Sequence, residues 1–204
     1  MFFKQIQQHG DNFSYVIADE NTKQAAVVDS SFNAGAIIQI IKAEKFNLKY
    51  IINTHGHSDH TAGYHELKSI FGAKIVAHKL SKVNFDVAVE DEEVLTVGNV
   101  PIKVIYTPGH TLDGICLVVD NKKLLTGDTL FVGECGRTDF SGGSPKSLYN
   151  SLFNKLSRLN DNLEVYPGHD YGLKPSSTIG EEKKSNYTLQ PRSLDDFVKF
   201  MKQP

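Results

Sequence analysis

The sequence lacks tryptophan and contains only two cysteines and two methionines among its 204 residues. The two cysteines, Cys116 and Cys135, are too few and too far apart for a disulfide framework or for a zinc site built on thiolates. Any metal ion that the chain binds must therefore be held by histidine and carboxylate side chains.

Long apolar runs and an excess of charge of one sign are also missing. No run approaches the roughly 18 apolar residues of a membrane span, and residues 1–5 lack the apolar segment of a signal peptide. The net charge of −2 does not provide the basic surface that binds nucleic acid. We therefore expect a cytoplasmic protein that binds neither membranes nor nucleic acids, while the sequence leaves its state as a monomer or an oligomer open.

Apolar residues make up 40% of the chain, which is enough for a substantial core, and β-type runs alternate with helical patterns in both halves. Strands are predicted at residues 3–7, 13–18, 25–29, 49–53, 74–77, 94–97, 102–107, 115–119, 123–126 and 163–166. Helices are predicted at residues 34–46 and 62–71, after the Ser144-Pro145 start signal, and after Ser193. We predict one α/β domain over residues 1–204, a four-layer αββα sandwich of two mixed sheets flanked by helices.

Histidines are crowded into one short segment of the chain. His55, His57, Asp59 and His60 follow directly after the predicted buried strand at residues 49–53. Because residues two apart on an extended chain point the same way, His55 and His57 can approach one metal ion. Asp59 and His60 then face a neighbouring position.

Three more polar residues end predicted strands at glycine-containing turns: His110, Asp128 and His169. Seven such residues suit a two-metal site, in which a carboxylate bridges ions roughly 3.5–4 Å apart. We assign three histidines to one metal: His55, His57 and His110. We assign three further ligands, Asp59, His60 and His169, to the other metal, with Asp128 between the two. A water that bridges such ions has its pKa lowered to about 7, which provides hydroxide as a nucleophile at neutral pH.

The other three histidines, His9, His65 and His78, have no comparable partners in the sequence. We expect them to be solvated or hydrogen-bonded rather than metal ligands.

The ligand pattern resembles that of the metallo-β-lactamase superfamily over essentially the whole chain. The run from His55 to His60 matches the HxHxDH motif of the superfamily, and His110, Asp128 and His169 match its later ligands. Asp29, which ends the run Val-Val-Asp, matches an early acid that supports the ligands. The resemblance implies the αββα fold and a metal-dependent activity.

Within the superfamily, the segments 127–131, 135–140 and 177–183 resemble both glyoxalase II-type thioester hydrolases and persulfide dioxygenases. Both groups act on glutathione-like thiol adducts. The motif THGHSDH at residues 54–60 is more similar to the hydrolases, whereas CGRTDF at 135–140 followed by His-Asp-Tyr at 169–171 is more similar to the dioxygenases.

These resemblances lead to two enzymatic hypotheses. In the first, two divalent ions (zinc, iron or manganese) polarise the carbonyl of a thioester such as S-lactoylglutathione while the bridging hydroxide attacks, and Asp59 orients that hydroxide. In the alternative, His55, His110 and Asp128 hold a single Fe(II) that binds a persulfide and O₂. We take hydrolysis as the leading hypothesis. A non-catalytic binding module is the third, but a degenerate scaffold would be expected to lose ligands, and this chain keeps all seven.

The resemblance to the hydrolases also makes Arg137 and Tyr171 candidates for binding the glutathione end of the substrate, because an arginine fork suits a carboxylate. The alternative for Arg137 is a structural ion pair with Asp139 or Asp170. Whether residues 133–143 form a lid is left open by the sequence.

Overall fold

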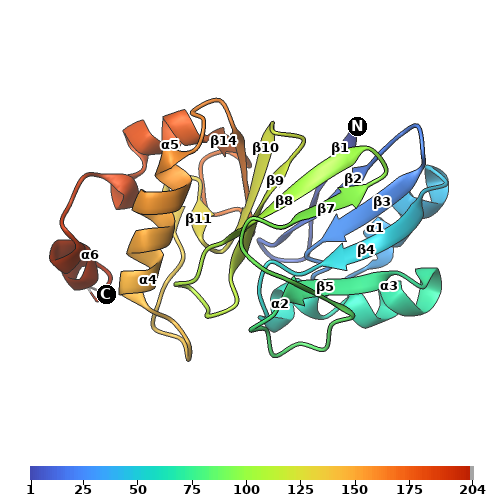
Figure 1. Ribbon diagram of the computed structural model, residues 1–204, viewed down its shortest axis with the longest axis horizontal. Helices are drawn as coiled ribbons and strands as arrows, with labels where there is room; N and C mark the ends of the chain where they lie inside the picture. Colours follow the sequence, from blue (N-terminus) through green and yellow to red (C-terminus); the bar gives the residue numbers. More distant parts are fainter. Residues whose placement is uncertain (203–204) are drawn as a thin grey trace.

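The computed structural model describes residues 1–202, in which two six-stranded sheets stack face to face with helices on both outer sides (Figure 1). The first sheet has the order β1 (Phe2–Gln7), β2 (Phe13–Ala18), β3 (Gln24–Val28), β4 (Asn47–Ile52), β5 (Lys74–His78) and β6 (Val87–Val89). Its first three strands form an antiparallel meander, and the pairs from β3 to β6 are parallel.

The second sheet is also mixed, with β10 and β13 as its parallel pair. Its order is β14 (Ser177–Thr178), β13 (Glu164–Pro167), β10 (Lys123–Gly127), β9 (Ile115–Val119), β8 (Val100–Tyr106) and β7 (Val94–Val97). A small separate hairpin pairs β11 (Leu130–Phe131) with β12 (Glu134–Cys135).

Helices α1 (Gly35–Ala43) and α3 (Tyr64–Phe71) pack on the first sheet, and the short α2 (Ser58–Thr61) precedes α3. The second sheet is covered by α4 (Pro145–Tyr149), which continues as a π-helical segment (Asn150–Lys155) and a 3-10 turn (Leu156–Arg158), and by α5 (Ile179–Ser185) and α6 (Leu194–Phe200). A further 3-10 turn (Tyr187–Leu189) joins α5 to α6. The predicted four-layer sandwich is confirmed. Within residues 1–202, no helix has the length and apolar character needed to cross a bilayer.

Strand β2 shows how the layers produce the sequence pattern. Phe13, Tyr15 and Ile17 pack into the core between the two sheets, whereas Val16 and Ala18 pack against the helices. Since both faces of the strand are covered, the whole strand is buried and its sequence shows no alternation of polar residues.

Several boundaries differ from the sequence-based expectations. Helix α1 ends at Ala43 rather than at residue 46, because Lys45 takes a left-handed conformation with φ of 56°. The predicted helix at 62–71 begins only at Tyr64, and the N–H of Gly63 just before it bonds to the carbonyl of Ser31 (2.6 Å). The sequence patterns did not predict α2, β6, the β11–β12 hairpin, β14 or α5, which are all short or lack a strong periodic pattern.

Candidate metal centre

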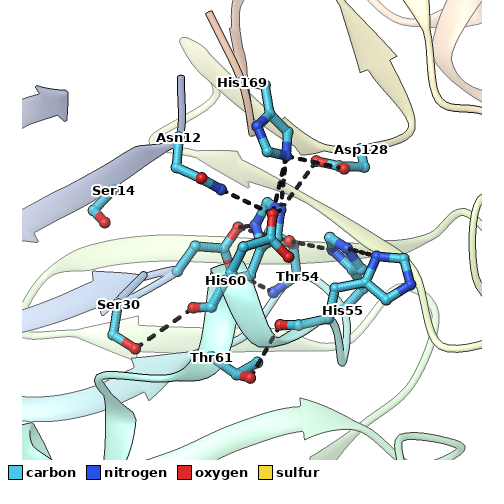
Figure 2. Close-up of polar contacts among 12 residues, drawn as sticks. Asn12, Ser14, Ser30, Thr54, His55, His60, Thr61, Asp128 and His169 are labelled. Carbon is cyan, nitrogen blue, oxygen red and sulfur yellow. Dashed lines mark hydrogen bonds and ion pairs between the residues drawn. The ribbon is translucent and has the colours of Figure 1, made fainter. Parts of the chain in front are cut away.

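The seven predicted ligands lie together at one end of the sandwich, where four loops meet. Figure 2 shows part of this cluster, with His60 facing His169 and Asp128. His55, His57, Asp59 and His60 come from the loop after β4 and from α2, and His110, Asp128 and His169 come from the loops after β8, β10 and β13.

The first ligand set consists of His55, His57 and His110. The Nδ1 atom of His57 lies 3.0 Å from Nε2 of His55 and 3.1 Å from Nε2 of His110. Nitrogens at these separations suit a common ion with Zn–N distances of about 2.0–2.1 Å. The Nδ1 atoms of His55 and His110 lie 3.2 Å from Thr54 Oγ1 and 2.8 Å from the Arg137 carbonyl oxygen, which fixes the ring orientations.

The second ligand set consists of Asp59, His60 and His169. The Nε2 atoms of His60 and His169 are 3.2 Å apart, and each lies 3.4 Å from Oδ2 of Asp59. These atoms form a second group that is close enough together to hold one ion.

Each member of this second set has its own supporting side chain. Asp29 Oδ2 lies 3.0 Å from Nδ1 of His60, and Asp11 Oδ1 lies 3.1 Å from Nδ1 of His169. Asn12 donates a hydrogen bond to the Asp59 carboxylate (3.1 Å). The family resemblance points to Asp29, whereas no sequence motif singles out Asp11 or Asn12.

Asp128 lies between the two sets. Its Oδ2 is 3.5 Å from Nε2 of His110 and 3.3 Å from Nε2 of His169, and its Oδ1 is 3.3 Å from Nε2 of His60. The buried Oδ1 accepts no hydrogen bond, and a buried carboxylate oxygen without a partner is costly unless a cation compensates it. The residues present therefore fit a bridging position between two metal ions.

Gly168 allows the two sets to approach each other. A Cβ atom at this position would lie 2.3 Å from Oδ1 of Asp128 and 2.9 Å from Cε1 of His60. Because both distances are shorter than van der Waals contact, any other residue would displace the bridging carboxylate.

Burial and charge set the protonation of the centre. Burial lowers the pKa of His55 well below its ordinary value, and the neighbouring His60 adds to this effect, so that the ring is neutral as a metal ligand must be. Burial would raise the pKa of Asp128, but His60 and His169 outweigh it and hold this pKa well below its ordinary value. The bridging carboxylate is therefore ionised. Burial would lower the pKa of these two histidines, but Asp128 and the neighbouring carboxylates outweigh it and raise both pKa values, that of His169 to about 10. Each of these rings must therefore release a proton to bind a metal ion.

The centre opens into a cavity of about 640 Å³. Its wall beyond the ligands is mainly aromatic and apolar: Phe131, Cys135, Phe140, Tyr171, Tyr187, Phe200 and Met201, with Glu134 and Arg137 as the charged members. A mainly apolar cavity with a few fixed polar groups is typical of a small-molecule site.

The two predicted substrate-binding residues both line this cavity. The ring of Tyr171 stacks on His169 at 4.9 Å between centroids. Arg137 is exposed and forms a forked ion pair with Asp139, which is the structural alternative considered for it. Its guanidinium also lies 4.5 Å from the Phe140 ring centroid.

The remaining histidines and both cysteines lie outside the two ligand sets. His9 and His65 are exposed, and His78 is buried and stacks on Tyr106 at 4.1 Å. Cys116 and Cys135 are buried free thiols, and burial raises their pKa to about 11 and about 12.

Two stacked mixed sheets with a histidine and aspartate centre at one end define a metal-binding αββα protein. Residues 9–169 match the family described as the metallo-beta-lactamase superfamily, and the chain belongs to this superfamily.

Relatives of two activities are similar to the chain over most of its length. It is 35% identical to the mitochondrial persulfide dioxygenase ETHE1 of Homo sapiens over 93% of this chain and 75% of the relative. It is 38% identical to the hydroxyacylglutathione hydrolase of Pelagibacter ubique over 88% of this chain and 75% of the relative. The crystal structure of ETHE1 from Myxococcus xanthus superimposes with a TM-score of 0.94 at 32% identity, covering 100% of this chain and 92% of that one. These relatives define an enzyme family with two chemistries.

Proposed function

We propose that the chain is a two-metal thioester hydrolase that acts on acyl-thiols of the S-lactoylglutathione type. His55, His57 and His110 would hold one divalent ion, and Asp59, His60 and His169 would hold a second. Asp128 would be shared between the two, and zinc or iron is the expected metal.

The observation that carries this proposal is the support given to the second ligand set. Asp29, Asp11 and Asn12 each hold one ligand of that set within 3.0–3.1 Å. Such outer partners orient metal ligands and contribute strongly to metal affinity. The same seven residues are also compatible with a single ion at the other position, and the metal content measured below separates the two arrangements.

The ions would supply an activated water as nucleophile and stabilise the negative charge that develops on the thioester oxygen. The protein has no need of a serine or cysteine nucleophile, and both thiols are buried. Asp59, held by Asn12 and half-buried at the cavity wall, is positioned to accept a hydrogen bond from the attacking water. A thiol leaving group with a pKa near 8.5 departs with little assistance from a general acid.

The cavity wall suits a thiol adduct. Phe131, Phe140 and Tyr171 surround the ligands with aromatic surface for the acyl group and the carrier arm. Arg137 lines this cavity, and we assign it to binding a carboxylate of the carrier. To do so, Arg137 would give up its exposed ion pair with Asp139. Exposed ion pairs of this kind stabilise a fold little, so the exchange costs little.

The alternative function is oxidation of a persulfide such as glutathione persulfide at one Fe(II). The similarity to the human and Myxococcus xanthus proteins supports it. His55, His110 and Asp128 offer the two histidines and one carboxylate that such iron sites use.

A paired assay on anaerobically purified protein tests the proposal. We expect thiol release from S-lactoylglutathione, no oxygen uptake with glutathione persulfide, and close to two metal ions per chain by elemental analysis. Oxygen uptake together with one iron per chain would replace hydrolysis by the alternative. If neither reaction is observed, the acyl-thiol proposal itself is wrong.

A further inference from the structure

The cavity continues from the metal centre along the β11–β12 hairpin towards α6. The Phe131 ring lies 5.9 Å from the His169 ring, and Phe131 pairs with Glu134 across the hairpin. Glu134, Tyr187 and Phe200 line the cavity beyond Phe131. Glu134 therefore lies beyond Phe131 as seen from the ligands, on the order of 10 Å from them, because the Phe131 ring and one cross-strand step of about 5 Å separate the two.

The hairpin holds the half-buried Glu134 firmly in place. The Cys135 N–H donates to Oε1 of Glu134 (3.2 Å), and the Tyr187 hydroxyl donates to Oε2. The fully buried Asn186 donates to the Glu134 carbonyl oxygen (3.0 Å) and to the carboxylate of the buried Glu182 (2.8 Å), which also accepts the N–H of Gly133 (2.8 Å). Both the backbone and the carboxylate of Glu134 are thus fixed before any ligand arrives.

The charge of Glu134 has no cationic partner. Within residues 1–202, no lysine, arginine or histidine nitrogen forms an ion pair with this carboxylate. Arg192, which stacks on Phe200 at 4.2 Å, directs its guanidinium to the carbonyl oxygens of Gln190 and Tyr187 instead. The result is an anionic group beside aromatic rings, a combination that attracts an organic ammonium ion by charge and by cation–π contact.

We infer that Glu134 forms an ammonium-binding subsite, so that the preferred thiol adduct carries a primary amine about 10 Å from its sulfur. This inference rests on the proposed acyl-thiol function and specifies the class of carrier. The length is that of a γ-linked dipeptide arm between a cysteine sulfur and an α-amine. A carrier whose arm is uncharged gains no binding affinity from the charge of Glu134.

A binding experiment with two unreactive probes tests this subsite. S-methylglutathione carries the α-ammonium group, and N-acetyl-S-methylglutathione replaces it with a neutral amide. By titration calorimetry on the metal-loaded protein, we expect the first probe to bind about tenfold more tightly. The variant Glu134→Gln keeps the size and the hydrogen-bond acceptor, and we expect it to bind both probes equally.

Three further variants complete the test. Tyr187→Phe removes one hydrogen bond that holds the carboxylate, and we expect it to reduce the preference about threefold. Glu92→Gln, which removes an exposed ion pair with Lys103 elsewhere, should retain the full preference. Glu134→Asp retains the charge one methylene further from the cavity, and we expect it to keep part of the preference.

Equal binding of both probes to the wild-type protein, or no binding, overturns the subsite. A preference that survives in Glu134→Gln also overturns it, because the acetyl group would then act by its size. A protein that shows the charge preference but neither hydrolyses nor oxidises thiol adducts would retain the subsite and lose the proposed function. The two failures are thereby distinguished.

Discussion

The two ligand sets are built from the same kind of strand-end loop but differ in charge. The first set contains three imidazoles, and two of them contact neutral oxygens, Thr54 Oγ1 and the Arg137 carbonyl. The second set contains a carboxylate, and both of its histidines contact further carboxylates, from Asp29 and Asp11. Because carboxylates near a binding position favour a divalent cation, we expect the second position to retain its ion more tightly than the first.

The largest effect is expected from the residue that both sets share. Asp128→Ala removes the bridging carboxylate, and we expect kcat for thioester hydrolysis to fall about a thousandfold or more. Elemental analysis should show fewer than two ions per chain. The control is Asp120→Ala, which removes an exposed ion pair with Lys122. We expect this variant to retain the wild-type kcat and metal content. Normal turnover by the Asp128 variant would exclude the shared-ligand arrangement.

Replacing one histidine in each set separates the two positions. We expect His60→Asn to reduce the metal content from two ions to one and hydrolysis about a hundredfold, because an ion without its ligand is lost from the second position. His57→Asn should instead empty the first position. Persulfide oxidation that persists in His60→Asn while hydrolysis is absent from the wild type would show that one ion suffices. Thermal unfolding checks that both variants fold.

The outer partners of the second set provide a finer test. Asn12→Ala and Asp11→Asn leave every ligand in place but remove a hydrogen bond to one of them. We expect the affinity of the second ion to fall about 10- to 100-fold, measured by competition with a chelator. Asn21→Ala, on the next turn of the meander, should bind both ions normally. An unchanged affinity in the first two variants would remove the distinction between the sets.

The smallest effects are expected at the aromatic rim. Phe140 lies beside the first set, 5.2 Å from His57, and Tyr171 stacks on His169 of the second set. We expect Phe140→Ala to raise KM about tenfold with little change in kcat, because it removes apolar contact to the substrate arm. Tyr171→Phe keeps the stacked ring and should change KM less than threefold. A fall in kcat alone would assign these rings to the reaction rather than to binding.

The sequence predicted the layers and the ligands better than the surroundings of the ligands. The buried strand β9 is a continuous apolar run and β2 is apolar except for Ser14, and the ligands follow strands at glycine-containing turns, so both have local signals. Asp11 and Asn12 have only the local signal of a turn, because their contacts to His169 and Asp59 join segments far apart in the chain. Local sequence patterns predict local structure. Polar partners that lie far apart in the chain can be identified only once the fold is known.

The same limit applies to Arg137 and Glu134. The family resemblance selected Arg137, which forms its ion pair with Asp139, two residues further along the chain. Glu134 carries no motif, and its importance appears only when the short β11–β12 hairpin places it in the cavity opposite Phe131. Two-residue strands lack the periodicity that reveals longer ones.

The buried Asn186 and Glu182 tie the β11–β12 hairpin to α5 through the backbone at Phe131, Gly133 and Glu134. The hairpin therefore loses its conformational entropy during folding. A small molecule that binds against the hairpin does not have to order it, so binding carries no further entropic cost from this segment. Exchanging the side chain of Glu134 can then alter which molecules bind in the cavity while the predicted metal ligands, which lie on other loops, keep their positions.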